Sequence, residues 1–439
     1  MAKRYNRRSM LKTSVMAGSL GLTLPDILRL RAKAADNGAE RKDTAVIQIW
    51  LGGGISQFES WDPKPEAPRE IRGPWKSIPT ALAGVHFCEL LPRQARVLNK
   101  MAIIRSVWHK SSGHDGGTTI CATGRSAKGH PSMGSVAAMF RRTSGFGVPS
   151  YVQMKAPTTA NPTFLFNFNA HFLGNSFDPF NIGANPVTSS FEVPNLKLQE
   201  GLSLARLEER KGLLAKFDRL KRAGDEGGAV ASMDHFQQAA FEMLTAEGTR
   251  QAFDLSREDP KLRERYGNHW WGQSALLARR LVEAGVTFVN INTGPDGIFW
   301  DIHGGSAGTV KDTMQMGCRD LDAMVSTLVE DIYERGLDKK VLVLVWGEFG
   351  RTPTINERAG RDHWPSVGSL ALSGGGLRMG QVIGASDKIG GEPVERPIRP
   401  QDVLATVYNH LGIDPKGHLV NLSGQPIPIL NDGKRIAEL

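Results

Sequence analysis

Six consecutive apolar residues, VLVLVW at Val341–Trp346, constrain the fold of this chain more than any other segment. A strand that is apolar on both faces belongs inside a sheet that helices cover on both sides. Before it, apolar residues recur at three- and four-residue steps, which predicts an amphipathic helix from Met314 to Ile332 that ends by Gly336. A helix followed by a buried strand favours an α/β fold with a mainly parallel sheet.

The same alternation continues through most of the chain. TAVIQIWLGGG at Thr44–Gly54 predicts a buried first strand that ends in a glycine turn. Residues 150–200 are rich in Asn, Phe, Pro and Gly, and we expect an irregular and partly helical insertion around 150–260. The other predicted elements are helices at Leu202–Arg222, Ser232–Ala252, Gly272–Gly285 and Gln401–Gly412, and strands at Met101–Val107, Val286–Thr293 and Ser369–Leu377.

The positive charge of the chain is concentrated at its N-terminus. Removing the +7 of residues 1–34 from the +9 of the whole chain leaves +2, which argues against nucleic-acid binding. The twin arginines of NRRSMLK (Asn6–Lys12), a mildly apolar stretch and the small-x-small motif Ala32–Ala34 predict a twin-arginine signal peptide. An amphipathic basic helix is the alternative. We expect a signal at 1–34, a linker at 35–43 and a single domain at 44–439.

The predicted signal defines the environment of the mature protein. It implies the Tat export machinery as a partner and a periplasmic or otherwise extracytoplasmic location. No later segment approaches the ~20 continuous apolar residues of a membrane span, so we expect no transmembrane segment in the mature chain. Cys88, Cys121 and Cys318 lack the spacing of a disulfide framework or a zinc finger. One disulfide remains open in an oxidising compartment, and the sequence does not choose its pair.

Carboxylates and histidines follow several predicted strands. Asp301 and His303 lie in WDIH, Glu348 follows the central strand in GEFGRTP, and Asp362 and His363 lie in GRDHWP. Loops at the carboxyl ends of parallel strands converge on one crevice, and a mixture of carboxylate and imidazole suits a divalent metal. The sequence therefore predicts a metal site, with a capped turn as the alternative for Asp362 next to His363.

A second cluster follows the predicted strand at Met101–Val107. His109 and His114 lie in a turn rich in Gly and Ser, and a helix is predicted from Gly116 onward. Such a turn offers free backbone N–H groups to an anion. The alternative is a tight turn with solvated histidines.

With these motifs in place, the chain resembles the DUF1501 family of exported bacterial proteins, which is assigned to the alkaline phosphatase/sulfatase-like superfamily. The resemblance covers roughly Thr44 to Asp414. It rests on LGGGISQFESWDPKP, SSGHDGGTTICATGR, RYGNHWWGQSALLARRLVEAGVTFV, WDIHGG, WGEFGRTP and GRDHWP, in that order. It implies a three-layer sandwich with helices on both faces of the sheet. By order of appearance it also implies metal ligation by Glu59, Asp301, His303, Glu348 and His363.

The chain departs from that superfamily at two positions. The nucleophile of its phosphatases and sulfatases lies ten residues before the glycine of a TG dipeptide, and here that position is His114 rather than Ser, Thr or Cys. Cys121 lies only three residues before the same glycine, Gly124, so a formylglycine precursor is absent. Phe349 replaces a metal-binding histidine, so one of two metal sites is lost or rebuilt, and His109 is the candidate replacement ligand.

Two functions remain open. The first is an exported metal-dependent hydrolase of a phosphate or sulfate ester, either an extracellular polysaccharide or a small phosphoester. Arg351 would hold the anion, His114 would be nucleophile or general acid/base, and Ser112 would be the fallback nucleophile. The second is a binding or assembly protein that retains the fold and the metal without turnover. In either case we expect zinc, manganese or iron rather than magnesium, because the ligand set contains nitrogen.

Overall fold

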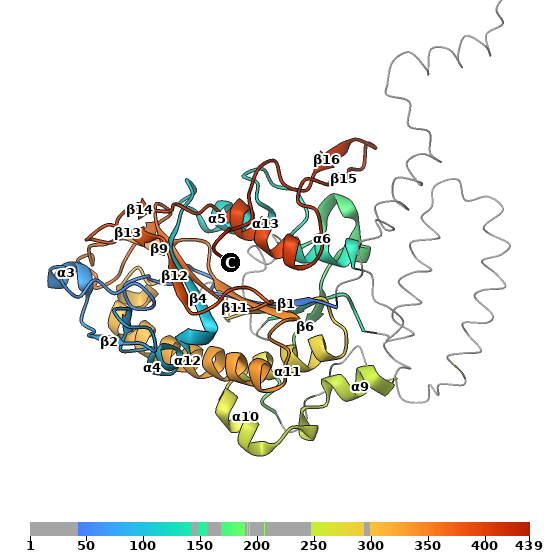
Figure 1. Ribbon diagram of the computed structural model, residues 1–439, viewed down its shortest axis with the longest axis horizontal. Coiled ribbons are helices and arrows are strands. Elements are labelled where there is room, and N and C mark those ends of the chain that lie inside the picture. The colour runs from blue at the N-terminus through green and yellow to red at the C-terminus, as the bar shows by residue number, and fades with distance from the viewer. Residues whose placement is uncertain are drawn as a thin grey trace, which may run out of the picture.

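The computed structural model describes residues 43–141, 148–155, 168–188, 191, 193, 206, 247–293 and 299–439. At its centre is an eight-stranded sheet with the strand order β12-β4-β11-β8-β1-β7-β5-β6 (Figure 1). All neighbouring strands are parallel except β11, which is antiparallel to both β4 and β8. The predicted α/β fold with a mainly parallel sheet is confirmed. The strands are β1 (Ala45–Trp50), β4 (Met101–Val107), β5 (Tyr151–Met154), β6 (Phe180–Ile182), β7 (Phe288–Asn292), β8 (Val341–Trp346), β11 (Gly368–Gly374) and β12 (Gln381–Ile383).

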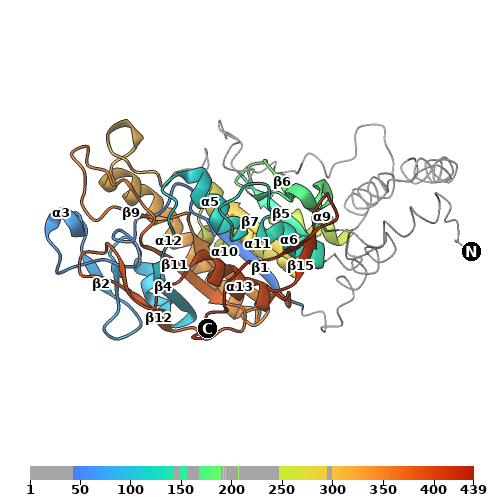
Figure 2. The same cartoon turned by 90° about the horizontal axis from the view of Figure 1, so that it is seen from above.

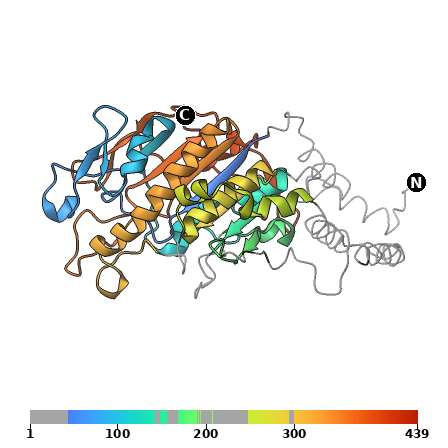
Figure 3. The same ribbon diagram turned by 90° about the horizontal axis from the view of Figure 1, so that it is seen from below.

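Helices cover both faces of this sheet, and β8 shows why its sequence is apolar throughout. Alternate residues of a strand point to opposite faces. Val343 and Val345 pack into the core beneath α11 (Trp270–Glu283) and α12 (Val310–Glu334), which lie along one face in Figure 3. Leu344 and Trp346 pack into the core on the opposite face. The helices on that face, seen in Figure 2, are α5 (His114–Thr123), α6 (Met133–Phe140) and α13 (Pro400–His410).

The predicted helix before β8 is α12, and it is longer than the apolar repeat indicates. It begins at Val310 because the side chain of Thr309 accepts a hydrogen bond from the backbone N–H of Asp312 and caps the helix. Its glycine at Gly317 lies where a Cβ atom would be 2.5–3.0 Å from the rings of Phe299 and Trp300. The close approach fixes the segment that follows β7 against α12.

The parallel strands all end at one edge of the sheet. The loops after β1, β4, β7 and β8 therefore meet there, and the antiparallel β11 begins at the same edge. A short hairpin of β9 (Gly350–Arg351) and β10 (His363–Trp364) lies between β8 and β11. Every candidate site residue named from the sequence belongs to one of these connections.

Part of the predicted insertion extends the sheet. Residues 150–200 were predicted to be irregular, yet β5 and β6 pair in parallel beside β7. Strands of three and four residues are too short to produce a periodic pattern. The predicted helix at Leu202–Arg222 lies outside the described residues apart from Arg206, and of Ser232–Ala252 only the last residues are described, within α9 (Glu247–Phe253). The predicted signal peptide also lies outside them.

Smaller elements complete the described part of the chain. No helix there is both long enough and apolar enough to cross a bilayer. The three cysteines are buried and free. The remaining helices of more than one turn and the short strands are α3 (Arg69–Arg72), α4 (Pro92–Arg96), α10 (Pro260–Tyr266), β2 (Ser77–Pro79), β3 (His86–Cys88), β13 (Ala385–Ser386), β14 (Pro393–Glu395), β15 (His418–Val420) and β16 (Pro426–Pro428).

A buried ion network fastens α11 to its surroundings. The guanidinium of Arg279 donates to Asp331 of α12 at 2.9 Å, to Glu258 at 2.7 Å and to Glu283 at 2.6 Å. Its side chain is almost completely buried, so each carboxylate compensates a charge that has lost its water. Burial would raise the pKa of Glu258, but the hydrogen bonds and charges of Arg279 and Arg280 outweigh it and lower that pKa.

Candidate metal centre

Four residues from three connections converge at the carboxyl edge of the sheet. They are His114, Asp301, His303 and His363, and each offers a ligand atom within 4.8 Å of the others. His114 is the first residue of α5, Asp301 and His303 follow β7, and His363 lies in β10. Three of the four were predicted as metal ligands, whereas His114 was predicted as a nucleophile or acid/base.

The convergence is centred on the carboxylate of Asp301. The Nε2 atoms of His303 and His363 each lie 3.0 Å from its Oδ1 atom, and the Nε2 atom of His114 lies 3.2 Å from its Oδ2 atom. The Nε2 atoms of His303 and His363 are themselves 3.0 Å apart. Three imidazoles therefore present the same ring nitrogen to one carboxylate.

The other nitrogen of each imidazole is held by an oxygen acceptor. His114 Nδ1 lies 2.7 Å from Glu348 Oε1, His303 Nδ1 lies 2.7 Å from Asp362 Oδ1, and His363 Nδ1 lies 2.6 Å from the carbonyl oxygen of Ser112. An acceptor at each Nδ1 atom places a hydrogen there, so Nε2 is the ring nitrogen that each histidine directs toward Asp301. Outer-sphere acceptors of this kind accompany histidines that bind metals.

The ionisation of the cluster follows from these contacts. Burial alone would lower the pKa of His114, but hydrogen bonds with Asp301 and Glu348 outweigh it and raise that pKa to about 9. Burial would raise the pKa of Asp301, yet its hydrogen bonds with His114 and His363 and the charge of Arg351 hold it well below its usual range. The cluster therefore retains ionised carboxylate at neutral pH.

Two loops are joined so that His303 and His363 meet. The backbone N–H of Arg361 donates to the carbonyl of Ile302 at 2.8 Å. A Cβ atom at Gly360 would lie 2.1 Å from the backbone of His303 and Gly304, so the close approach requires glycine. This contact explains why the GRDHWP motif accompanies the WDIHGG motif.

Glu348 lies behind His114 rather than among the four converging residues. Its Oε1 atom also accepts a hydrogen bond from the N–H of Gly53 at 2.8 Å. Its Oε2 atom is buried and has no hydrogen-bond partner in the described ranges. A carboxylate oxygen withdrawn from water without a partner is costly, so this atom indicates a missing positive charge or donor.

His109 supports Glu348 and does not join the cluster. Its Nδ1 atom accepts from the N–H of Ser111 at 3.1 Å, so its Nε2–H donates to the carbonyl of Glu348. Burial lowers the pKa of His109, which favours this neutral form. Because both ring nitrogens are engaged, the structure does not support the predicted role of His109 as a replacement ligand.

Arg351 lies behind the cluster and is held by backbone carbonyls. Its side chain is completely buried, and its Nε and Nη1 atoms donate to the carbonyls of Gly54 and Arg361, both at 2.9 Å. Its Nη2 atom donates to Asp301 Oδ1 at 2.6 Å. Arg351 therefore lies behind Asp301 and orients it, and its role in holding a substrate anion stays a prediction.

Glu59 lies apart from the cluster. Its completely buried carboxylate accepts from Arg361 Nη2 at 2.7 Å and from the hydroxyl of Ser56. The predicted ligand is thus already neutralised by a guanidinium. The sequence analysis did not predict a role for Arg361. Its position beside Asp362 and His363 in GRDHWP is the only sequence feature that associates it with the site.

Two neighbours of the cluster remain. The ring of Phe349 packs against His363 and His114, with centroids 4.4 Å and 5.4 Å apart, and so limits their movement. Ser112 is exposed, and its carbonyl holds His363. No sequence pattern predicts this contact, because it is made by a backbone carbonyl.

The fold and this cluster together define an α/β protein in which three histidines and one aspartate, at the edge of its sheet, could hold a metal ion. The chain belongs to the DUF1501 family, described as proteins of unknown function, whose family model matches residues 43–439. The resemblance found in the sequence is confirmed at the level of this family. No curated protein matches the chain.

Solved structures give only distant similarity. The lipoteichoic acid synthase LtaP from Listeria monocytogenes is 10% identical with a TM-score of 0.38, and the match covers 93% of this chain and 80% of that one. The phosphonate monoester hydrolase of Agrobacterium radiobacter is 11% identical with a TM-score of 0.37, covering 90% and 78%. A protein in the alkaline phosphatase superfamily from Vibrio parahaemolyticus is 11% identical with a TM-score of 0.36, covering 90% and 77%. Similarity at this level assigns no activity to the chain.

Proposed function

We propose that this protein is a metal-dependent hydrolase of a phosphate or sulfate ester. The observation that carries the proposal is the convergence of three Nε2 atoms on Asp301, with every Nδ1 atom already held by an acceptor. Hydrolases of anionic esters use such a site to stabilise charge on the reacting group.

The residues present fit a transition metal. Three imidazoles and a carboxylate are the ligand types of zinc, manganese or iron, whereas magnesium prefers oxygen and water. The Nε2 atoms of His303 and His363 are 3.0 Å apart, and their lone pairs repel one another unless a proton or a cation lies between them. The orphan Oε2 atom of Glu348 adds negative charge nearby. A cation at this position would relieve the repulsion between the two imidazoles.

When bound, a divalent cation polarises the ester oxygen and lowers the pKa of a coordinated water or hydroxyl. The chain itself orients the ligands: Arg351 holds Asp301, Glu348 holds His114, and Asp362 holds His303. In this proposal His114 is a ligand, and Ser112 is the exposed hydroxyl left as a candidate nucleophile.

One observation favours a second function, a binding or assembly protein with a structural metal. Three histidines and one aspartate would provide four ligands, the number that fills a structural zinc site. A catalytic site keeps one position open. Asp301 or one histidine would have to leave the metal, or the metal would have to expand its coordination, for turnover.

Elemental analysis of the purified mature protein together with turnover assays on phosphate and sulfate esters tests the proposal. We expect about one zinc, manganese or iron ion per chain and release of inorganic phosphate or sulfate that chelation abolishes. Stoichiometric metal without turnover of either ester class would support the second function instead. We further propose that the protein is exported by the twin-arginine route and acts outside the cytoplasm, because its charge pattern at residues 1–34 is that of such a signal.

A further inference from the structure

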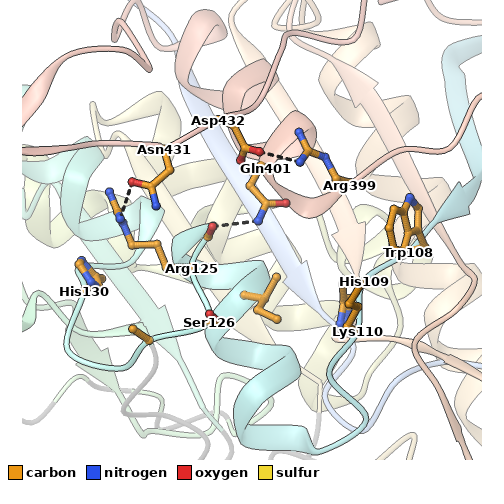
Figure 4. Close-up of a pocket in the computed structure, with 13 residues that line it drawn as sticks. Trp108, His109, Lys110, Arg125, Ser126, His130, Arg399, Gln401, Asn431 and Asp432 are labelled. Atoms are coloured by element: carbon orange, nitrogen blue, oxygen red, sulfur yellow. Dashed lines mark hydrogen bonds and ion pairs between the residues drawn. The ribbon is translucent and has the colours of Figure 1, made fainter.

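A separate cavity lies alongside α5. Its volume is about 480 Å³, within the range of small-molecule sites. Figure 4 shows its walls: the segment after β4 at Trp108–Lys110, the end of α5 with Arg125, the start of α13 at Arg399, and the C-terminal segment at Asn431 and Asp432. The metal cluster lies at the other end of α5, a helix of ten residues and about 15 Å.

The charges around this cavity are unbalanced. Lys110, Arg125 and Arg399 carry positive charge, and the one carboxylate lining it, Asp432, is bound to Arg399 at 2.7 Å (Figure 4). Arg125 donates to the side-chain oxygen of Asn431 at 2.7 Å and to the carbonyl of Pro428, which are both neutral. Within the described ranges, neither Lys110 nor Arg125 forms an ion pair with a carboxylate in this cavity. The net charge of the lining therefore favours an anion.

The partial burial of Arg125 strengthens this argument. Burial lowers the pKa of Arg125, so its charge has lost part of its hydration without gaining a carboxylate in exchange. His130, which also lines the cavity, has its pKa lowered first by burial and then by the charges of Arg125 and His171.

The walls are fixed and retain unused polar atoms. The amide of Gln401 donates to the carbonyl of Gly124 at 2.9 Å and joins α13 to the end of α5. Gln401 Oε1 and Asn431 Nδ2 have no hydrogen-bond partner elsewhere in the described part of the chain. An inorganic anion would fill only a fraction of the 480 Å³ of the cavity. A larger polar ligand would also contact these amides and the indole of Trp108.

We propose that this cavity binds a phosphorylated or sulfated sugar, with the anionic group between Lys110 and Arg125 and the sugar hydroxyls against Gln401 and Asn431. A charged donor on a phosphate or sulfate oxygen gives the strong part of such recognition. The amides and Trp108 distinguish the sugar derivative from the free ion. The proposal concerns the cavity alone and does not require turnover at the metal centre.

Isothermal titration of the full mature chain with glucose 6-phosphate, glucose 6-sulfate, unmodified glucose and inorganic phosphate tests the proposal. We expect both anionic sugars to bind and glucose not to bind. Lys110→Gln and Arg125→Gln should each weaken binding by about 10-fold or more, the loss expected for one charge-assisted hydrogen bond. Lys388→Gln, which removes an exposed positive charge elsewhere, is the matched control and should bind as the parent does.

Three outcomes would overturn the proposal. Undiminished binding in a Lys110→Gln/Arg125→Gln double variant would place the ligand elsewhere. Loss of binding in His303→Ala/His363→Ala would show that the anion occupies the metal cluster. Inorganic phosphate binding as tightly as glucose 6-phosphate would reduce the cavity to an ion site. Arg125→Lys keeps the charge and should retain most of the affinity, which separates recognition from a loss of the contacts to Asn431 and Pro428.

Discussion

His114 Nε2 lies 3.2 Å from Asp301 Oδ2, and this contact joins the start of α5 to the loop that follows β7. Each of the two residues is also held on its other side. Glu348 contacts Nδ1 of His114, and Arg351 donates to Oδ1 of Asp301. Hydrogen bonds from outer residues fix the orientation of this imidazole and this carboxylate, which is the arrangement found around ligands of a bound cation.

Removing two of the converging imidazoles should remove the metal. We expect His303→Ala/His363→Ala to lose bound metal and to unfold at a lower temperature, because the free energy of metal binding contributes to folding stability. Elemental analysis and thermal unfolding measure both effects. His418→Ala, a change at an exposed histidine, is the control. Stoichiometric metal in the double variant would exclude this ligand set.

Glu348 should act on the metal through His114. Glu348→Gln retains the shape of the side chain but weakens the acceptor at His114 Nδ1, and outer-sphere changes of this kind reduce metal affinity by about 10- to 100-fold. Competition with a chelator measures that affinity. Glu357→Gln, at an exposed position, should leave it unchanged. An unaltered affinity in Glu348→Gln would mean that the 2.7 Å contact does not tune the site.

The sequence predicted the sheet edge and much of the cluster for one physical reason. Asp301, His303 and His363 lie in connections of apolar strands, and parallel strands bring such connections together. Their geometry could not be predicted, because it depends on contacts between distant segments, such as that between Arg361 and Ile302.

The surroundings of Glu59 also could not be predicted from the sequence. Its place after the first strand matched the expected order of ligands, but the guanidinium that neutralises it belongs to Arg361, in a distant loop. For His114, the sequence predicted the position but not the contacts of the ring. Spacing from Gly124 identified the position, whereas the direction of its two nitrogens follows from Glu348 and Asp301, which only the fold brings together.

Stability should depend on pH through Glu258. Its pKa in the folded chain is lowered from 4.5, so its contribution is fully present above pH 4.5 and is lost as the pH falls through the lowered value. Glu258→Gln should therefore destabilise the protein at neutral pH by about 3 kcal/mol, as for one partner of a buried ion pair, and by less in acid. Denaturant unfolding at pH 7 and pH 3 measures the difference. Equal losses at both pH values, or a similar loss in the exposed control Glu392→Gln, would contradict this assignment.

Export should depend on the twin arginines. Arg7→Lys/Arg8→Lys keeps the positive charge but removes the pattern of a twin-arginine signal, so we expect the precursor to accumulate in the cytoplasm. Fractionation and the mass of the mature chain measure export and cleavage. Lys3→Arg/Lys12→Arg is the control with the same number of charges, and it should be processed. Normal processing of the twin-lysine variant would point to another route.

Substitution of His114 should distinguish between its two possible roles, metal ligand and proton-transfer group. If His114 is a ligand, as its 3.2 Å contact with Asp301 favours, His114→Ala should lose metal, and kcat should fall with occupancy and recover when excess metal is added. If His114 instead transfers a proton, the variant should keep its metal while kcat falls by about 10²-fold or more. Metal content and kcat, measured on the same preparation across a metal titration, separate the two, with His418→Ala as the control. We expect the first result. A fully metallated and fully active His114→Ala variant would exclude both roles and would direct attention to the exposed hydroxyl of Ser112.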